Sequence, residues 1–306
     1  MDDFKVTILG SGSAVPTSWH NPSGQVVLYR GKQYLIDCGE GTQMQMIRYK
    51  IKPKNLDHVF ISHLHGDHYY GLIGLINSFH LMRREKPLHI YAPADLKAIL
   101  NIQLKVSNTK LYYPLVFHPL EDSSGVLFTD DYFSVKAFPL LHSIPVWGFL
   151  FQEKERDRRI DKTFVKSYQP SIYKLKKIKD GVDFKTDKGE ILKNKDITLQ
   201  AYPSRSFAYC SDTAYLESTA KYVKGVDLLY HESTFDNSQK ELATKTLHST
   251  AAQAARVAME ARAGKLLLGH YSARFKELDS LLEEARVIFP ESYLSVEGDC
   301  YTIEIQ

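Results

Sequence analysis

Three histidines and one aspartate lie within six consecutive residues, in the segment His63-Leu64-His65-Gly66-Asp67-His68. In an extended loop, residues two apart project to the same side, so His63 and His65 can approach one ion together. Imidazole nitrogens and carboxylate oxygens without a thiolate suit Zn²⁺, with Mn²⁺ or Fe as substitutes. Four ligands this close cannot all surround one tetrahedral ion and still leave a position open for chemistry. The segment therefore predicts a centre that holds two metal ions.

Further candidate ligands occur later in the chain. His142 lies in the segment PLLHS, while Asp212 and His270 each follow a predicted strand. An isolated histidine after a strand is more often a hydrogen-bonded structural residue, and Asp212 could instead cap a turn or a helix. These three residues become candidates because a centre with two ions needs more ligands than the first segment contains.

The pattern of apolar residues predicts a mixed α/β fold. In the N-terminal third, short segments rich in β-branched and aromatic residues predict strands at 4–10, 25–30, 33–38 and 58–62, with a hairpin turn at Gly31-Lys32 and a helix at 67–83. After a polar middle, predicted strands at 207–210, 226–230 and 265–268 alternate with predicted helices at 249–262 and 275–287. Ser249 or His248 is expected near the N-cap of the first of these helices. Strands followed by alternating strands and helices favour helices packed outside sheets.

Residues 152–200 interrupt this pattern. They contain 14 Lys and Arg against 9 Asp and Glu, in a chain whose formal net charge is only +3. Five lysines and no acidic residue lie between Lys166 and Lys179. Because few apolar residues are available for a second core, we interpret this stretch as an arm inserted into a single domain that spans 1–306. The alternative is a solvated loop without a specific role.

Composition excludes several other classes of protein. An apolar content of 43% with a nearly balanced charge excludes a disordered chain. No apolar run approaches the ~20 residues that span a bilayer, and the acidic N-terminus does not resemble a signal peptide. Three scattered cysteines are too few for a disulfide framework or a thiolate zinc site. We therefore expect a cytoplasmic protein with no membrane partner.

The order of the candidate ligands along the chain resembles that of the metallo-β-lactamase superfamily. Within it, segments spread over nearly the whole chain are most similar to the ribonuclease Z family of tRNA 3′-processing endonucleases. These segments are Leu9-Gly10-Ser11-Gly12, Asp37-Cys38-Gly39-Glu40-Gly41-Thr42, His231-Glu232-Ser233-Thr234-Phe235, His248-Ser249-Thr250 and His270-Tyr271-Ser272-Ala273-Arg274-Phe275.

The resemblance implies a four-layer αββα sandwich, a homodimer and two zinc ions per subunit. One ion would be held by His63, His65 and His142. The other would be held by Asp67, His68 and His270, and Asp212 would bridge the two ions. Residues 152–200 occupy the place of the arm with which this family grips precursor tRNA.

The reaction implied is hydrolysis of a phosphodiester that removes the 3′ trailer of precursor tRNA and leaves a 3′-hydroxyl on the tRNA. Two zinc ions would lower the pKa of a bridging water and polarise the phosphate. The residues expected to act on the substrate are Asp67 as proton acceptor, His248 (held by Glu232) as the group that protonates the leaving 3′-oxygen, Arg274 as a phosphate contact, and Lys174, Lys176 and Lys177 as arm contacts to RNA. For Glu232, His248 and Arg274 the alternative is a surface ion-pair network.

Two segments depart from the family pattern. Residues 16–21 (PTSWHN) lack the two cations usual in the N-terminal loop, and Pro170-Ser171 stands where the arm usually has a Gly-Pro pair. Two other functions are compatible with parts of the sequence. One is a hydrolase of the same superfamily that acts on a small phosphodiester, thioester or lactam. The other is a non-enzymatic metal- or RNA-binding protein with a degenerate site, which predicts missing ligands, although none of the seven is missing.

Overall fold

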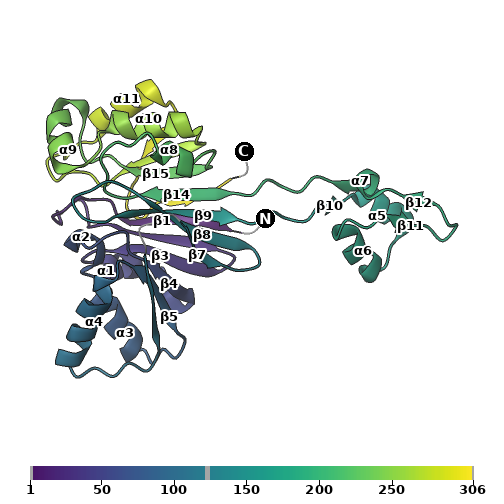
Figure 1. Ribbon diagram of the computed structural model, residues 1–306, viewed down its shortest axis with the longest axis horizontal. Coiled ribbons are helices and arrows are strands. Elements are labelled where there is room, and N and C mark those ends of the chain that lie inside the picture. The colour runs from purple at the N-terminus through teal and green to yellow at the C-terminus, as the bar shows by residue number, and fades with distance from the viewer. Residues whose placement is uncertain (1–2, 121–124, 305–306) are drawn as a thin grey trace.

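Two seven-stranded sheets pack face to face in the computed structural model, which describes residues 3–120 and 125–304. Helices cover the outer face of each sheet, so that the layers run helix, sheet, sheet, helix (Figure 1). The predicted αββα sandwich is therefore confirmed.

The first sheet comes from the N-terminal half of the chain and one strand from the C-terminus. In spatial order its strands are β18 (Cys300–Thr302), β1 (Phe4–Gly10), β2 (Gly24–Tyr29), β3 (Lys32–Cys38), β4 (Leu56–Phe60), β5 (Leu88–Ala92) and β6 (Leu115–Pro119). The strands from β3 to β6 are parallel to one another, and the others pair antiparallel. Its outer face packs against α1 (Thr42–Arg48), α3 (Leu72–Leu81) and α4 (Asp95–Val106).

The second sheet combines a parallel half with an antiparallel half. In spatial order its strands are β17 (Ser292–Leu294), β16 (Lys265–Gly269), β15 (Leu228–Glu232), β14 (Ser206–Cys210), β9 (Trp147–Glu153), β8 (Phe133–Pro139) and β7 (Gly125–Thr129). The strands from β14 to β17 run parallel. Its outer face packs against α8 (Thr219–Tyr222), α10 (Ala251–Ala261) and α11 (Asp279–Ile288), and α9 (Lys240–Thr246) precedes α10.

An aromatic core joins the two sheets. Phe60 of β4 stacks on Tyr91 at 4.6 Å between ring centroids, and it meets Phe149 and Phe151 of β9 at 5.6 and 5.4 Å. Large rings in tilted and edge-on contact fill the gap between sheets with few voids. This packing fixes the spacing of the sheets, and therefore the distance between strand ends that face each other across the gap.

Several predicted elements have different bounds in the structure. The hairpin turn between β2 and β3 is formed by Arg30 and Gly31, both with positive φ (49° and 77°), and not by Gly31-Lys32. Positive φ at both central residues is the requirement of a type I′ turn. The polar middle of the chain contains β5 to β9 and α4, for which the apolar pattern predicted no elements.

Two predicted helices begin later than expected. The cap of α10 is Thr250, not Ser249 or His248, because Thr250 and Gln253 form a reciprocal capping box. The helix predicted at 275–287 starts four residues later, at Asp279.

The helix predicted at 67–83 is two helices, α2 (Gly66–Tyr69) and α3. The break comes at Gly71, whose N–H donates to the carbonyl of Cys38 at 2.9 Å. A Cβ at Gly71 would collide with the carbonyl oxygen of Gly39. Close contact with the end of β3 therefore ends α2 and sets the direction in which its side chains point.

A small subdomain projects from one end of the sandwich on two connecting segments (Figure 1). Its elements are β10 (Arg159–Ile160), α5 (Lys162–Tyr168), α6 (Ile172–Lys179), β11 (Phe184–Lys185), β12 (Ile191–Leu192), α7 (Asn194–Ile197) and β13 (Thr198–Leu199). It has a core of four buried side chains, Phe164, Ile178, Phe184 and Ile197. Since β9 continues to Glu153, the first two residues of the predicted insertion 152–200 belong to the second sheet.

The helices and the cysteines bear on two further predictions, the absence of a membrane span and of a disulfide framework. Among the described residues, no helix has the length and apolar character needed to cross a bilayer. All three cysteines are free thiols, and Cys38 and Cys210 are buried.

We predict that Gly71→Ala lowers the free energy of unfolding by about 1–3 kcal/mol, because the new methyl group forces the chain away from Gly39. Gly74→Ala is the matched control. Gly74 lies inside α3, and a Cβ there would meet only Gln43 Oε1 at 3.9 Å, an ordinary van der Waals contact, so this substitution should raise stability by roughly 0.5–1 kcal/mol. Urea denaturation measures both values, and equal stability of the two variants would contradict the steric role of Gly71.

Candidate metal centre

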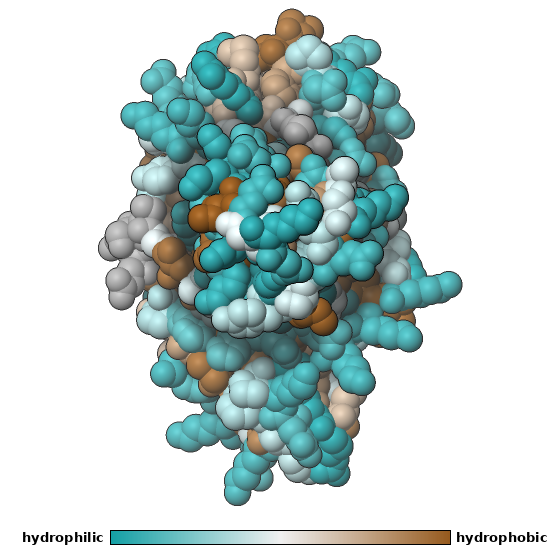
Figure 2. Space-filling view, turned by 90° about the vertical axis from the view of Figure 1, so that its right-hand side faces the viewer, coloured by the Kyte–Doolittle hydropathy of each residue, from teal (hydrophilic) through white to brown (hydrophobic). Residues whose placement is uncertain are grey.

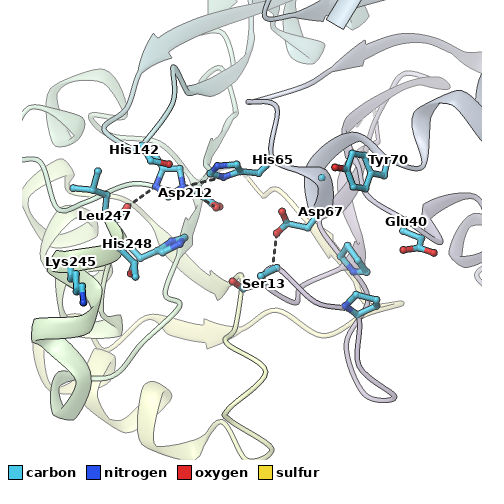
Figure 3. Close-up of a pocket in the computed structure, with 16 residues that line it drawn as sticks. Ser13, Glu40, His65, Asp67, Tyr70, His142, Asp212, Lys245, Leu247 and His248 are labelled. Atoms are coloured by element: carbon cyan, nitrogen blue, oxygen red, sulfur yellow. Dashed lines mark hydrogen bonds and ion pairs between the residues drawn. The ribbon is translucent and has the colours of Figure 1, made fainter. Parts of the chain in front are cut away.

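A cleft of about 690 Å³ opens at the edge of the sandwich where strands of both sheets end. Side chains from loops that follow strands of both sheets, and from the short helices α2 and α9, line it (Figure 3). The seven predicted ligands arrive from separate places: His63 and His65 after β4, Asp67 and His68 in α2, His142 after β8, Asp212 after β14 and His270 after β16.

The structure brings the predicted ligands together in two groups. In the first, one ligand atom each from His63, His65, His142 and Asp212 lies within 4.8 Å of the others. His65 Nδ1 is 3.1 Å from His63 Nε2 and 3.2 Å from His142 Nε2. This group could hold one metal ion.

The second group consists of Asp67, His68 and His270. Asp67 Oδ2 is 3.4 Å from His270 Nε2 and 3.5 Å from His68 Nε2. Asp212 lies between the groups, with Oδ2 at 3.6 Å from His63 Nε2 and Oδ1 at 3.1 Å from His270 Nε2. One carboxylate therefore faces both groups with different oxygens.

Hydrogen bonds on the far side of the rings assign the tautomers of four histidines. Nδ1 of His142 lies 2.9 Å from the carbonyl oxygen of Leu247, which can only accept a hydrogen bond. Nδ1 of His68 lies 2.8 Å from Asp37 Oδ2. The remaining two Nδ1 atoms contact hydroxyls whose own protons are directed to carboxylates, His63 at Ser62 (3.0 Å) and His270 at Thr234 (3.0 Å). With the proton on Nδ1, each ring turns an Nε2 lone pair toward the cleft.

These lone pairs fit a bound cation. His68 Nε2 and Asp212 Oδ1 are buried without a hydrogen-bond partner. Buried acceptors that face one another need a positive charge between them. Zinc–nitrogen bonds of about 2.0–2.1 Å place tetrahedral ligand atoms roughly 3.3 Å apart, close to the separations found here. The donor set and its spacing therefore suit metal binding.

Asp37 supports the centre, although the sequence assigned it no role. Besides His68, its carboxylate accepts from the Ser62 N–H (2.7 Å), the Ser62 hydroxyl (2.9 Å) and the Tyr209 hydroxyl (2.7 Å). Asp37 is fully buried and has a φ of 53°, a conformation that costs energy for a residue with a Cβ. The only sequence signal was its place in the segment 37–42 that resembles the family.

Glu232, which is fully buried, and His248, which is partly buried, form a pair beside the second group. Glu232 Oε1 lies 2.9 Å from His248 Nδ1 and accepts from the N–H groups of Thr213 and Ser249. Burial opposes protonation of His248, but the carboxylate of Glu232 outweighs it and raises the pKa of His248 to about 9. Glu232 is fully buried, so a surface ion-pair network does not describe this pair.

The other predicted substrate contacts lie outside the cleft. Arg274 is exposed, and among the described residues its guanidinium reaches only the hydroxyl of Ser272, at 3.4 Å. In the arm, Lys174 is 3.6 Å from Asp187, while Lys176 and Lys177 are exposed.

The sequence analysis assigned no role to three polar side chains of the cleft wall. Lys245, Tyr70 and Glu40 line the cleft (Figure 3). Lys245 lies in a short polar helix and Tyr70 follows another, and nothing in the local pattern distinguishes either residue from an ordinary surface side chain.

We predict that Asp37→Asn weakens metal binding by about 10–100-fold, because an amide cannot accept from all the donors around it and no longer orients His68. Titration of the metal-free protein with Zn²⁺ or Mn²⁺ measures the affinity. Asp227→Asn is the matched control, since Asp227 is a half-buried carboxylate that bonds Ser206 far from the cleft. Unchanged metal affinity in Asp37→Asn would contradict this role.

Comparison with known proteins agrees with the geometry. Two family models match parts of the chain, "Anti-Pycsar protein Apyc1" over residues 4–137 and "Beta-lactamase superfamily domain" over residues 197–271. The solved structure of the short form of human tRNase Z is similar, with a TM-score of 0.72, 27% identity, and coverage of 98% of this chain and 100% of that one.

Relatives from bacteria extend over the whole chain. Ribonuclease Z of Bacteroides thetaiotaomicron is 44% identical over 99% of this chain and 96% of its own length. Ribonuclease Z of Porphyromonas gingivalis strain W83 is 43% identical over 94% of this chain and 95% of its own. Identity at this level over both full lengths shows that the chain belongs to the ribonuclease Z family.

Proposed function

We propose that this protein is a metal-dependent endoribonuclease that removes the 3′ trailer from precursor tRNA and leaves a 3′-hydroxyl on the tRNA. The observation that carries this proposal is the arrangement of seven nitrogen and oxygen donors in two groups that share Asp212. The Glu232–His248 pair lies beside them. Full-length similarity to ribonuclease Z supports the choice of substrate.

The proposed cofactor is zinc, with two ions per subunit. Five histidines and two aspartates without a thiolate form a donor set that zinc accepts readily. When bound, the ions supply a nucleophilic oxygen at neutral pH and neutralise charge on the phosphate. His63, His65 and His142 would hold one ion, Asp67, His68 and His270 the other, and Asp212 both.

Two residues are placed to move protons. The N–H of Ala14 donates to Asp67 Oδ2 at 2.8 Å, which fixes the orientation of a carboxylate that can accept a proton within the cleft. His248 binds Glu232 through Nδ1, so its Nε2 is the atom that can protonate the leaving 3′-oxygen. Glu232 keeps this imidazole charged and oriented.

The arm, residues 152–200, is proposed to bind the substrate. Lys176 and Lys177 are exposed on α6, and Lys174 lies on the same helix. Lysines on a projecting element attract RNA phosphates without regard to sequence. Arg274, which lies outside the cleft, remains a proposed phosphate contact for RNA that extends beyond it.

A homodimer is also proposed. The arm projects from the end of the sandwich opposite α2 (Figure 1), and α2 contributes Asp67 to the cleft lining, so the arm of one copy is better placed to serve the cleft of another. Exposed apolar side chains on the adjacent helices α1 and α3, including Met44, Ile47 and Leu81, offer a surface for a second copy. Light scattering should then give about twice the chain mass of 35.0 kDa. A cytoplasmic location, in keeping with the free thiols, stays a prediction.

We predict that the purified protein cleaves a precursor tRNA at the base of its 3′ trailer and that Asp67→Ala lowers the rate by at least about 10²-fold, because a metal contact and a proton acceptor are lost together. The rate is measured under single-turnover conditions with metal in excess. Equal cleavage by both proteins would remove Asp67 from the mechanism. Metal-loaded wild-type protein that cleaves no precursor tRNA would favour the small-molecule hydrolase.

We predict that replacing residues 157–201 by a short Gly-Ser linker abolishes cleavage of precursor tRNA but leaves hydrolysis of bis(p-nitrophenyl) phosphate within about twofold. The arm contributes RNA contacts, and no residue of the arm lines the cleft. Parallel assays of both substrates on the same preparation give the comparison. Loss of both activities, or of neither, would contradict the assignment of the arm to RNA binding.

A further inference from the structure

A second hollow lies far from the metal centre. It is a groove of about 500 Å³ between the turn of 3₁₀-helix at Pro53–Asn55 and the segment that joins α3 to β5. Its apolar lining residues are Pro53, Phe79 and Met82. Met82 is 64% exposed, whereas Phe79 is buried and lies under the guanidinium of Arg84. A large exposed apolar side chain in a hollow indicates a contact site more than a surface that faces water alone.

Cations surround this apolar floor. The side chains of Lys52, Lys54 and Lys86 line the groove, are exposed, and form no ion pair with another described residue. Arg83 adds a fourth cation, which lies over the ring of Tyr112 at 4.2 Å. The only acidic residue of the described lining is Glu85.

The fifth basic residue of the lining has a structural role. Arg84 donates to the Asp57 carboxylate at 2.6 Å and to the carbonyl oxygens of Leu56 and Pro87. These bonds tie the start of β4 to the start of β5 and hold the groove open. The four other cations are therefore left to attract an anion.

The topology places this groove at the end of the molecule that carries the arm. The metal ligands follow the C-terminal ends of β4 and β14, and the groove lies at the N-terminal ends of β4 and β5, which run parallel. The arm is inserted between β9 and the N-terminal end of β14. The surface seen at this end is predominantly hydrophilic, with small scattered apolar patches (Figure 2).

We propose that the groove is a second RNA-binding site, which takes a segment of the substrate's backbone away from the cut. Phosphates would meet Lys52, Lys54, Arg83 and Lys86, and a ribose or base would lie on the exposed side chain of Met82. This inference rests on the proposed function, since it assumes that the substrate is an RNA. Together with the arm, the groove would extend the contact with RNA over one end of the protein.

RNA matches this surface better than the alternatives. Four cations against one acid favour a polyanion over a peptide of mixed charge. An apolar floor flanked by cations provides both contacts that a nucleotide offers, a charged phosphate and a flat or apolar face. A membrane surface would require a convex apolar patch, whereas this one is recessed.

The test compares two triple variants with the same loss of charge. The groove variant is Lys52→Ala, Lys54→Ala and Lys86→Ala. The control is Lys97→Ala, Lys105→Ala and Lys110→Ala, three exposed lysines on and after α4 that form no ion pair with described residues. Affinity for a precursor tRNA is measured by fluorescence anisotropy over a series of salt concentrations, with hydrolysis of bis(p-nitrophenyl) phosphate as a check on folding and metal loading.

The groove variant should bind RNA more weakly at low salt. The slope of log affinity against log salt should also fall in magnitude by roughly 2, because each lost phosphate contact lowers the magnitude of the slope by about 0.7–0.9. The control should change the slope by less than about 0.5, and both should hydrolyse the small substrate as the wild type does. The same slope in both variants would show an effect of net charge alone and would overturn the proposal.

Two further outcomes would also decide against the groove. Unchanged RNA affinity in a groove variant whose oligomeric state has shifted would assign the surface to a second copy of the chain. Wild-type slope and wild-type oligomeric state would leave the groove without a role in RNA binding. A failure of the proposed function is distinguishable from these results, because wild-type protein would then neither bind nor cleave precursor tRNA.

Discussion

The meeting of nitrogen and oxygen donor atoms between two sheets constrains the rest of this structure. Nε2 atoms of His63, His68, His142 and His270 and both oxygens of Asp212 converge at one edge of the sandwich. Such a cluster is costly unless a cation occupies it. The aromatic core sets the spacing of the sheets, and the strand ends set the positions of the predicted ligands. The break at Gly71 directs α2 toward the place where these ligands meet.

Two buried carboxylates organise the side chains that face the cleft. Asp37 gathers His68, Ser62 and Tyr209, whereas Glu232 gathers His248 and the N–H groups of Thr213 and Ser249. Each carboxylate is surrounded by donors, which makes its burial tolerable and locks its neighbours into one arrangement. The two carboxylates therefore have different roles: Asp37 orients a predicted metal ligand, and Glu232 raises the pKa of an imidazole.

The sequence predicted the parts of the centre that depend on local spacing. The cluster from His63 to His68 was visible because its ligands are nearly adjacent, and His142, Asp212 and His270 followed from their order. Asp37 was not assigned, because its role depends on a left-handed backbone and on Tyr209, which lies 172 residues away.

In the fold, too, contacts between residues far apart in the chain could not be predicted from local patterns. Gly71 was placed inside a helix because the carbonyl of Gly39 that excludes a side chain there comes from another part of the chain. No strand was predicted at β8, although its burial alternates along 133–137 as a half-buried strand requires.

The arm is inserted between two strands that are hydrogen-bonded neighbours, β9 and β14, which would otherwise form a simple β-hairpin. It also has an apolar core of its own, with Phe164 and Phe184 in edge-to-face contact. An element attached in this way can lengthen, shrink or change its chemistry over evolutionary time without disturbing the strand ends that carry the ligands. With the arm in its proposed role of binding RNA, substrate choice and bond cleavage would be open to separate selection in a single polypeptide.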